Sequence, residues 1–301
     1  MIIVITGPTG VGKTRLSISL AKRYNAEIIN ADSVQVYRGL DIGSAKVTEK
    51  EKEGIVHHLI DIKNVNEEYT LYDYQKDARA CIDEITKKGK NIIIVGGTGL
   101  YIKSVLFDYN LSCEEGIQEE YEEISTPQLY KKLKDLDPLA KVDSHNRRRI
   151  VRAINYYNLN KSSISLNKSG DKLLYDALFI GLTMESREEL YQRINNRVDK
   201  MIEDGLVDEV KKFYDMDISG RVLNSAIGYK ELYDYFDGKI SYDEVVELIK
   251  RNSRRYAKRQ YTFFNNQFNI RWFCVDIDDF DKTIKEVSMY IENNKDYISR
   301  I

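Results

Sequence analysis

An eight-residue run near the start of the chain, GPTGVGKT, has the composition of a phosphate-binding loop. It fits the pattern G-x-x-x-x-G-K-[ST], and it follows an apolar run at residues 2–6 and precedes a helical segment at 13–24. In such a loop backbone N–H groups converge on phosphate oxygens, a lysine adds positive charge and a hydroxyl ligates magnesium. The residues predicted to bind phosphate are Gly7, Pro8, Thr9, Gly10, Val11, Gly12, Lys13 and Thr14, with Thr14 as the Mg2+ ligand. The loop predicts a bound di- or triphosphate, but it does not say which reaction follows.

A carboxylate near the loop would limit the reactions that the bound phosphate can undergo. In a nucleoside triphosphatase an apolar strand ends in an acid, but the apolar residues 92–95 run into GGTG at 96–99. The other short strand, at 27–31, is followed by Asp32. Asp32 is therefore the candidate base or metal-associated carboxylate, and its alternative role is the N-cap of a following helix.

The elements that must position these residues alternate between short apolar runs and helical segments. Strands are predicted at 2–6, 27–31, 92–95, 177–182 and 271–277, and helices at 13–24, 127–137, 146–159, 187–204 and 241–266. This alternation predicts an α/β fold, a phosphate-loop (P-loop) NTPase-like core with a parallel sheet and an inserted helical domain. We expect residues 1–111, about 172–202 and 245–301 to form the core, with the insertion within about 112–244.

Composition excludes some classes of protein. The 301 residues contain 46 Lys and Arg against 48 Asp and Glu, so any nucleic-acid binding must come from local basic clusters. The three cysteines, Cys81, Cys113 and Cys274, are far apart and form no zinc-binding pattern, so we expect reduced thiols. No apolar run reaches the ~18 residues of a membrane span, and we expect a cytoplasmic protein without membrane contact.

Six motifs, in order, resemble those of the tRNA dimethylallyltransferases, also called tRNA isopentenyltransferases. They are residues 7–14, 32–46 (DSVQVYRGLDIGSAK), 57–61 (HHLID), 96–101 (GGTGLY), 226–231 (AIGYKE) and 255–260 (RYAKRQ). The chain departs from the family pattern at Ser44, Val47 and Phe263, where relatives have Thr, Pro and Trp. Ser keeps the hydroxyl and Phe keeps the aromatic plane, so we expect the chemistry to be retained. The C-terminal zinc finger of some eukaryotic members has no counterpart in this sequence, so we expect the bacterial type.

The resemblance implies a prenyl transfer. The dimethylallyl group of dimethylallyl pyrophosphate moves to N6 of adenine 37, next to the tRNA anticodon, and pyrophosphate leaves. The family pattern implies that Asp32 is the catalytic base, that Thr98 hydrogen-bonds in the same site, and that Mg2+ is the cofactor. The implied partners are the tRNA anticodon stem-loop and the prenyl donor, and we expect a monomer.

Two basic clusters, residues 145–152 and 250–259, are candidates for binding RNA phosphates, although such runs also occur as solvated helix faces. The resemblance implies tRNA contacts at Asp32, Ser33, Val34, Gln35, Thr98, Arg148, Arg149, Arg152, Ser225, Gly228, Tyr229, Lys230, Lys258, Arg259 and Gln260. Tyrosines within or beside the motifs are candidates for stacking on splayed bases: Tyr37, Tyr101, Tyr229 and Tyr256.

Arg193 and Arg197 are four residues apart on one predicted helix face. We expect them to contact pyrophosphate, and the alternative is surface pairing with Glu188, Glu189 or Asp199. His57 and His58 are expected to be structural.

Two other functions remain open from the residues alone. A P-loop kinase would use Asp32 to activate a substrate hydroxyl. A nucleotide-gated RNA-binding protein would use the loop as a switch and the basic helices as its binding surface.

Overall fold

The computed structural model describes residues 1–109, 111, 121, 123–166, 170–218 and 220–298. Cys113 lies outside these residues. The chain divides into two compact units, the first comprising Met1–Val105 and Tyr175–Ile301 and the second Leu106–Leu174. The residues 203–244, which the predicted insertion range included, belong to the first unit.

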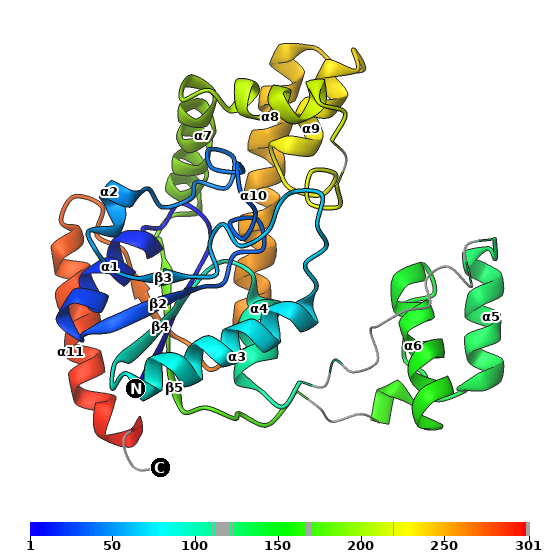
Figure 1. Cartoon of the computed structure of the whole chain (residues 1–301), viewed down its shortest axis with the longest axis horizontal. Helices are drawn as coiled ribbons and strands as arrows, with labels where there is room; N and C mark the ends of the chain where they lie inside the picture. Colours follow the sequence, from blue (N-terminus) through cyan, green and yellow to red (C-terminus); the bar gives the residue numbers. More distant parts are fainter. Residues whose placement is uncertain (110, 112–120, 122, 167–169, 219, 299–301) are drawn as a thin grey trace. The chain divides into compact units, whose positions relative to one another are not determined.

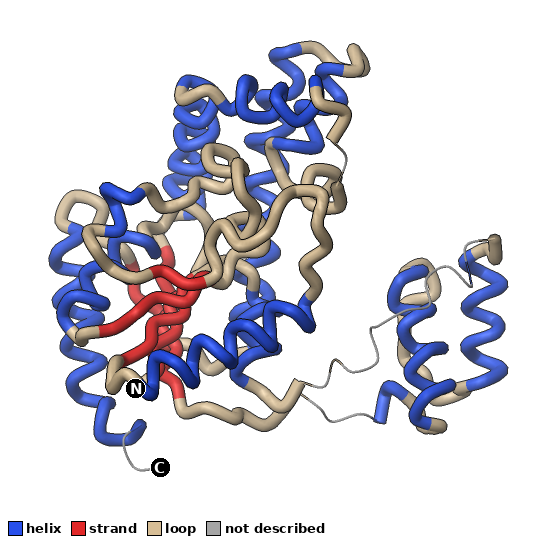
Figure 2. Tube along the Cα trace, viewed as in Figure 1, coloured by secondary structure: helices blue, strands red, loops and turns tan. Residues whose placement is uncertain are grey.

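The first unit is built on a six-stranded sheet with the order β3-β2-β4-β1-β5-β6. Every pair of neighbouring strands is parallel. The strands lie side by side at the centre of this unit, with helices around them (Figures 1 and 2). The strands are β1 (Ile2–Thr6), β2 (Ala26–Asn30), β3 (His57–His58), β4 (Asn91–Val95), β5 (Ala177–Thr183) and β6 (Arg271–Cys274). The predicted α/β fold with a parallel sheet is confirmed. Because all strands point the same way, their carboxyl ends meet at one edge of the sheet.

Helices cover both faces of the sheet (Figure 1). On one face α1 (Lys13–Arg23) and α11 (Phe280–Ile298) pack on alternate strand residues, so that Ile3 and Ile5 share a buried cluster with Leu16 and Val287. On the other face lie α3 (Leu71–Lys87) and α4 (Gly99–Leu106), joined by the stacked rings of Tyr74 and Tyr101 with centroids 3.9 Å apart. Burial on both faces explains why the central strands are continuous apolar runs.

Further helices of the first unit follow the strand ends. They are α2 (Glu49–Lys52), α7 (Arg187–Glu203), α8 (Leu206–Asp215), α9 (Tyr229–Phe236) and α10 (Tyr242–Gln267). The 26-residue α10 begins at a capping box in which Ser241 accepts from the backbone of Glu244 and Glu244 accepts from the backbone of Ser241. It contains no proline, as expected of a long uninterrupted helix.

The second unit is a small helical body. It contains α5 (Thr126–Leu136), α6 (Arg147–Asn160) and the 3-10 helix η2 (Ile164–Leu166). Leu129 and Leu133 of α5 pack against Ile150 and Ile154 of α6 in a core of their own. The Arg147 side chain donates to backbone carbonyls of the same unit. No helix in the described parts of either unit combines the length and apolarity needed to cross a bilayer.

A buried carboxylate links the strands at one side of the sheet. Glu27 of β2 is 2% exposed and contacts His58 Nε2 at 2.7 Å, Lys90 Nζ at 2.9 Å and Lys88 Nζ at 3.3 Å. Burial alone would raise the pKa of Glu27, but the hydrogen bonds from Lys90, His58 and Lys88 lower it to about 2. This contact supports the structural role predicted for the second histidine of the HHLID motif.

The Glu27 contacts predict a pH-dependent stability. The folded-state pKa lies below the ordinary value of 4.5, so the stabilisation is present above about pH 4.5 and is lost as pH falls toward 2. We expect Glu27→Gln to be less stable than wild type at pH 7, with a difference that shrinks by the order of 2–3 kcal/mol between pH 5 and pH 2. Urea unfolding of both proteins at several pH values measures this difference. A constant difference across the range would contradict the assignment.

Candidate functional site

The predicted phosphate loop connects β1 to α1 at the carboxyl edge of the sheet. Two of its glycines are required by geometry. A Cβ on Gly7 would lie 2.4 Å from the Leu182 carbonyl oxygen, so no side chain fits there. Gly12 has φ 91° and precedes the first residue of α1, a left-handed conformation that other residues rarely adopt. The loop therefore presents the N-terminus of α1 to the cavity described below.

Lys13 folds back over the loop. Its Nζ donates to the carbonyl oxygens of Gly7 at 3.0 Å and Pro8 at 2.8 Å. Burial, followed by the nearby positive charge of Arg197, lowers the pKa of Lys13 to about 7, while Asp32 opposes this shift. The cavity thus holds positive charge without enough negative charge to balance it, which favours binding of an anion.

Asp32 and Thr98 lie at adjacent strand ends, because β2 pairs with β4. Ser33 N donates to Thr98 Oγ1 at 3.1 Å, which joins the two loops. Asp32 Oδ1 accepts from Val34 N at 2.9 Å in a turn, and the structure has no α-helix directly after Asp32 among the described residues. The alternative role of Asp32 as a helix N-cap is therefore wrong.

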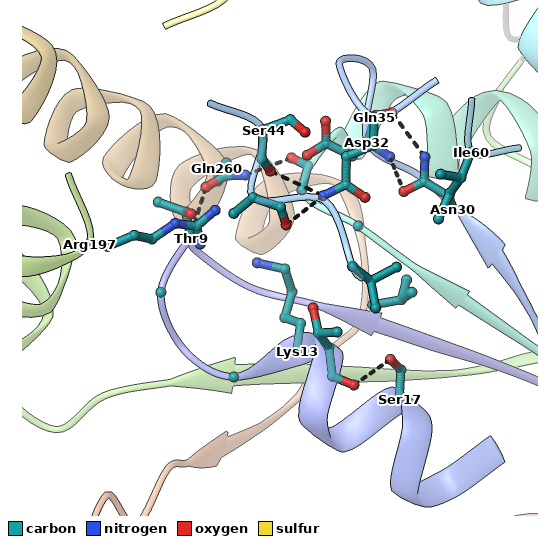
Figure 3. A pocket seen from close by; sticks show the side chains of 18 of the residues that line it. Thr9, Lys13, Ser17, Asn30, Asp32, Gln35, Ser44, Ile60, Arg197 and Gln260 are labelled. Atoms are coloured by element: carbon teal, nitrogen blue, oxygen red, sulfur yellow. Dashed lines mark hydrogen bonds between the residues drawn. The ribbon is translucent and has the colours of Figure 1, made fainter. Parts of the chain in front are cut away.

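Lys13 and Asp32 line one cavity of about 540 Å3 at the carboxyl ends of the strands, whereas Thr98 is not among its lining residues (Figure 3). Its lining combines loop, strand-end and helix residues: Thr9, Gly10, Gly12, Lys13, Thr14, Ser17, Ile28, Asn30, Asp32, Gln35, Ser44, Ala45, Val47, His57, Ile60, Val95, Gly96, Gly97, Arg193, Asn196, Arg197, Lys200, Tyr256 and Gln260. Among these lining residues Asp32 is the one carboxylate, whereas four lysines and arginines take part. The cavity can hold an anionic group at one place and a proton acceptor at another.

The two arginines of α7 reach this cavity. Arg193 Nε donates to the Gly10 carbonyl oxygen at 3.1 Å, and Arg197 is half-buried. Burial lowers the pKa of Arg197, and the charge of Asp32 acts in the opposite direction. One of the three acids named as alternative partners, Asp199, instead contacts Lys250 at 2.7 Å.

The family-implied tRNA residues of α10 and of the segment before α9 differ in exposure. Lys258, Arg259 and Ser225 are exposed. Gln260 is 6% exposed and bridges two loops of the cavity, accepting from Thr9 N at 3.1 Å and donating to the Gly97 carbonyl oxygen at 3.0 Å. Its side chain therefore fixes the cavity wall.

The residues implied on α6 belong to the second unit. Arg148 and Arg149 are exposed, and Arg152 is half-buried. Val34 and Gln35 are half-buried next to Asp32.

The expectation that motif tyrosines stack on bases is wrong for three of the four. Tyr37 is 6%, Tyr101 7% and Tyr229 0% exposed, so their rings offer no free face. Tyr101 already stacks on Tyr74, and Tyr229 fills the space beside Gly43. Tyr256 is half-buried and lines the cavity.

Sequence analysis does not identify two residues that line or support the site, Asn30 and Glu209. Asn30 is 3% exposed, and its Nδ2 donates to the carbonyl oxygens of Leu59 at 3.0 Å and Asp32 at 3.2 Å. Asn30 is a polar residue within the apolar run at 27–31, and this feature of the sequence could have identified it. Glu209, which contacts the loop around Gly43, had no such signal because it lies in an ordinary amphipathic helix.

The protein-family model described as IPP transferase matches residues 35–267. The chain belongs to the IPP transferase family. A tRNA dimethylallyltransferase of Anoxybacillus flavithermus is 48% identical over 97% of this chain and 96% of its own length. The crystal structure of a full-length tRNA isopentenylpyrophosphate transferase from Bacillus halodurans is 43% identical, with a TM-score of 0.77 over 99% of this chain and 98% of that one.

A eukaryotic dimethylallyltransferase acting on tRNA is also similar, at 29% identity and a TM-score of 0.85, over 97% of this chain and 78% of that chain. The family predicted from the motifs is confirmed, and with it the prediction of an enzyme. The alternative hypothesis of a non-enzymatic, nucleotide-gated RNA-binding protein is therefore wrong.

Proposed function

We propose that this IPP transferase family member transfers the dimethylallyl group of dimethylallyl pyrophosphate to N6 of adenine 37 in tRNA and releases pyrophosphate. The observation that carries the proposal is the cavity, where a phosphate loop with Lys13 and Arg197 meets one carboxylate, Asp32. Its curated relatives, named tRNA dimethylallyltransferase, match nearly the whole chain.

The residues divide the reaction into two tasks. Backbone N–H groups at the start of α1, Lys13 and the arginines Arg193 and Arg197 bind the diphosphate and stabilise the negative charge that grows as it leaves. Asp32 accepts the proton that N6 loses when nitrogen attacks the prenyl carbon. Thr98 holds the backbone of Ser33 and so fixes the turn that carries Asp32.

Magnesium is compatible with this arrangement. Mg2+ is usually held by one or two protein groups together with substrate phosphates and water, and the Thr14 hydroxyl lines the cavity beside the phosphate loop. The described residues contain no cluster of three or more His, Cys, Asp or Glu side chains suited to a metal, so substrate oxygens would supply most ligands. When bound, the ion would neutralise diphosphate charge. We propose Thr14 as its protein contact, which leaves Asp32 free to act as the proton acceptor.

The proposal includes a tRNA anticodon stem-loop as partner and a monomer acting in the cytoplasm. Adenine 37 must leave its stack to reach Asp32, which costs a few kcal/mol that other contacts must offset. Exposed basic residues on α10 and α6 are candidates for those contacts: Arg148, Arg149, Lys258 and Arg259. The half-buried Lys230, at the start of α9, is a further candidate, although its Nζ lies 3.7 Å from Glu231.

One assay separates the proposed reaction from phosphoryl transfer. The protein is incubated with unmodified tRNA and either ATP or dimethylallyl pyrophosphate, and the nucleosides of the digested tRNA are analysed by mass spectrometry. We expect a prenylated adenosine with dimethylallyl pyrophosphate and no phosphorylated product with ATP. Phosphoryl transfer without prenylation would refute the proposal in favour of a kinase.

The exposed basic residues of α10 predict a salt-dependent effect on tRNA binding. Lys258→Gln combined with Arg259→Gln should raise the Kd for tRNA. The slope of log Kd against log salt should fall by roughly 0.7–0.9 for each RNA phosphate that the variant no longer neutralises. Filter binding at several salt concentrations measures both quantities.

The matched control replaces two charges on another helix, Lys282→Gln with Lys285→Gln on α11. This pair should leave the tRNA Kd and its slope unchanged. Equal slopes for wild type and the α10 variant would mean that Lys258 and Arg259 contact no phosphates.

A further inference from the structure

A buried carboxylate of α8 holds the loop that contains the DIGSAK motif. Glu209 is 8% exposed, and its Oε2 accepts from the backbone N–H groups of Asp41 at 3.0 Å and Ile42 at 2.8 Å. Its Oε1 accepts from Gly43 N at 3.2 Å and from the Tyr229 hydroxyl at 2.5 Å. One side chain therefore binds three consecutive N–H groups and the tyrosine of the AIGYKE motif.

The ring of Tyr229 fits closely against the same loop. It is fully buried, and a Cβ on Gly43 would lie 2.5 Å from its Cε2. Burial, followed by the charge of Glu209, raises the pKa of Tyr229 far above its ordinary value, so the hydroxyl keeps its proton and donates a hydrogen bond to the carboxylate. Two family motifs that are 186 residues apart in the sequence, at Gly43 and Tyr229, thus meet at Glu209.

The loop held in this way forms part of the cavity wall. Ser44, Ala45 and Val47 line the cavity, directly after the residues that Glu209 binds. Ala45 has φ 46°, in the left-handed region that residues with a side chain rarely adopt. A strained conformation persists only where the surrounding contacts favour it over a relaxed one.

Two further side chains form hydrogen bonds that hold the loop. Gln35 Nε2 donates to the carbonyl oxygens of Ser44 at 3.1 Å and Ala45 at 3.3 Å, and Lys46 Nζ donates to the Tyr37 carbonyl oxygen at 2.8 Å. Glu209 also binds this loop, and it is not among the residues that line the cavity. Removing it would leave the backbone N–H groups of residues 41–43 without their side-chain acceptor and free the strained segment to relax.

We propose that Glu209 and Tyr229 are positioning residues that hold residues 44–47 in the conformation that the bound prenyl donor requires. This inference rests on the proposed function, because it assigns the wall to the donor site. Neither residue lines the cavity, so their effect passes through the loop.

The test compares two tyrosines of α9. Tyr229→Phe removes the hydrogen bond to Glu209 and keeps the ring, and Tyr233→Phe removes a similar bond, from the Tyr233 hydroxyl to the Ile218 carbonyl oxygen at 2.9 Å. We expect Tyr229→Phe to raise KM for dimethylallyl pyrophosphate by about tenfold, the value of one hydrogen bond to a charged group, and to leave KM for tRNA within twofold. Tyr233→Phe should leave both KM values unchanged even where it lowers Tm by a similar amount.

Hydrogen exchange gives a second readout that does not need activity. In Tyr229→Phe and in Glu209→Gln, the amides of residues 41–43 should exchange faster than in wild type, while those of α3 should not change. Equal donor KM values for the two tyrosine variants, or unchanged exchange at 41–43, would overturn the inference. Absence of prenyl transfer by the wild type would refute the proposed function instead, and the exchange result would still report on the hydrogen bonds of Glu209 themselves.

Discussion

Replacing Asp32 by alanine should lower kcat for prenyl transfer by about 10²–10⁴-fold, the usual contribution of a positioned general base. The reason is the composition of the cavity, whose lining residues include one carboxylate among several cationic side chains. Without it, the proton of N6 has no acceptor of suitable charge among those residues. Single-turnover rates with tRNA and dimethylallyl pyrophosphate, measured with tRNA in excess of its Kd, isolate this effect from binding.

Two further variants make the Asp32 experiment specific. Asp32→Asn keeps an oxygen that can accept from Val34 N, so the turn is retained, yet it should be as slow as alanine if proton acceptance is the role. Asp77→Asn changes a carboxylate of α3 that accepts from the Tyr69 hydroxyl at 3.0 Å and should retain wild-type activity. An Asp32→Asn enzyme with more than about a third of the wild-type rate would exclude Asp32 as the base.

The core of the fold was predictable because its signals are local. The strand at Ile2–Thr6, the phosphate loop and the helix at Lys13–Arg23 follow one another in the sequence, and each has its own apolar period or glycine pattern. The two-residue strand β3 escaped prediction since HH carries no strand signal. It is defined only by pairing with Ile28 and Ile29.

Residues of the candidate site were predictable where they belong to a recognisable sequence motif. Residues whose role depends on a long-range interaction were harder to predict. Asp32 and Lys13 were found from their places after a strand and in a loop. The burial of Tyr229 was not, because its environment depends on Glu209 and on Gly43, which is 166 residues from Glu209 in the chain. The sequence alone is compatible with both roles for a motif tyrosine, a ring that stacks on a base or a core residue, until that long-range packing is known.

The exposure of the basic residues of α10 is a similar case. Helical periodicity shows that Arg254, Lys258 and Arg259 share one helix, but it does not show which of them meet another element. Arg254 donates to Asn195 of α7 at 2.5 Å, whereas Lys258 and Arg259 are exposed. One arginine of the cluster therefore joins two helices, and the salt-dependence prediction rests on the other two residues.

The second large effect is expected at Lys13. Lys13→Met should lower kcat/KM for dimethylallyl pyrophosphate by about 10²–10³-fold, similar to the loss of one preorganised donor to a developing anion. The ammonium is held by the carbonyl oxygens of Gly7 and Pro8 beside the N-terminus of α1, in a place where burial and Arg197 disfavour its charge. An incoming diphosphate supplies the missing negative charge. Because that charge grows on the leaving group, both KM and kcat should change.

The control for Lys13 lies on the same helix. Lys22→Met removes a lysine of α1 that pairs with Glu53 far along the helix from the loop, and it should leave both constants unchanged. Calorimetry measures the binding of inorganic pyrophosphate to each variant. It separates the part of the kcat/KM loss that arises from ground-state binding from the part that appears only in turnover. If Lys13→Met bound pyrophosphate as tightly as wild type and kept its kcat, Lys13 would not neutralise the diphosphate, and this role would fall to the other cationic residues of the cavity, Arg193, Arg197 and Lys200.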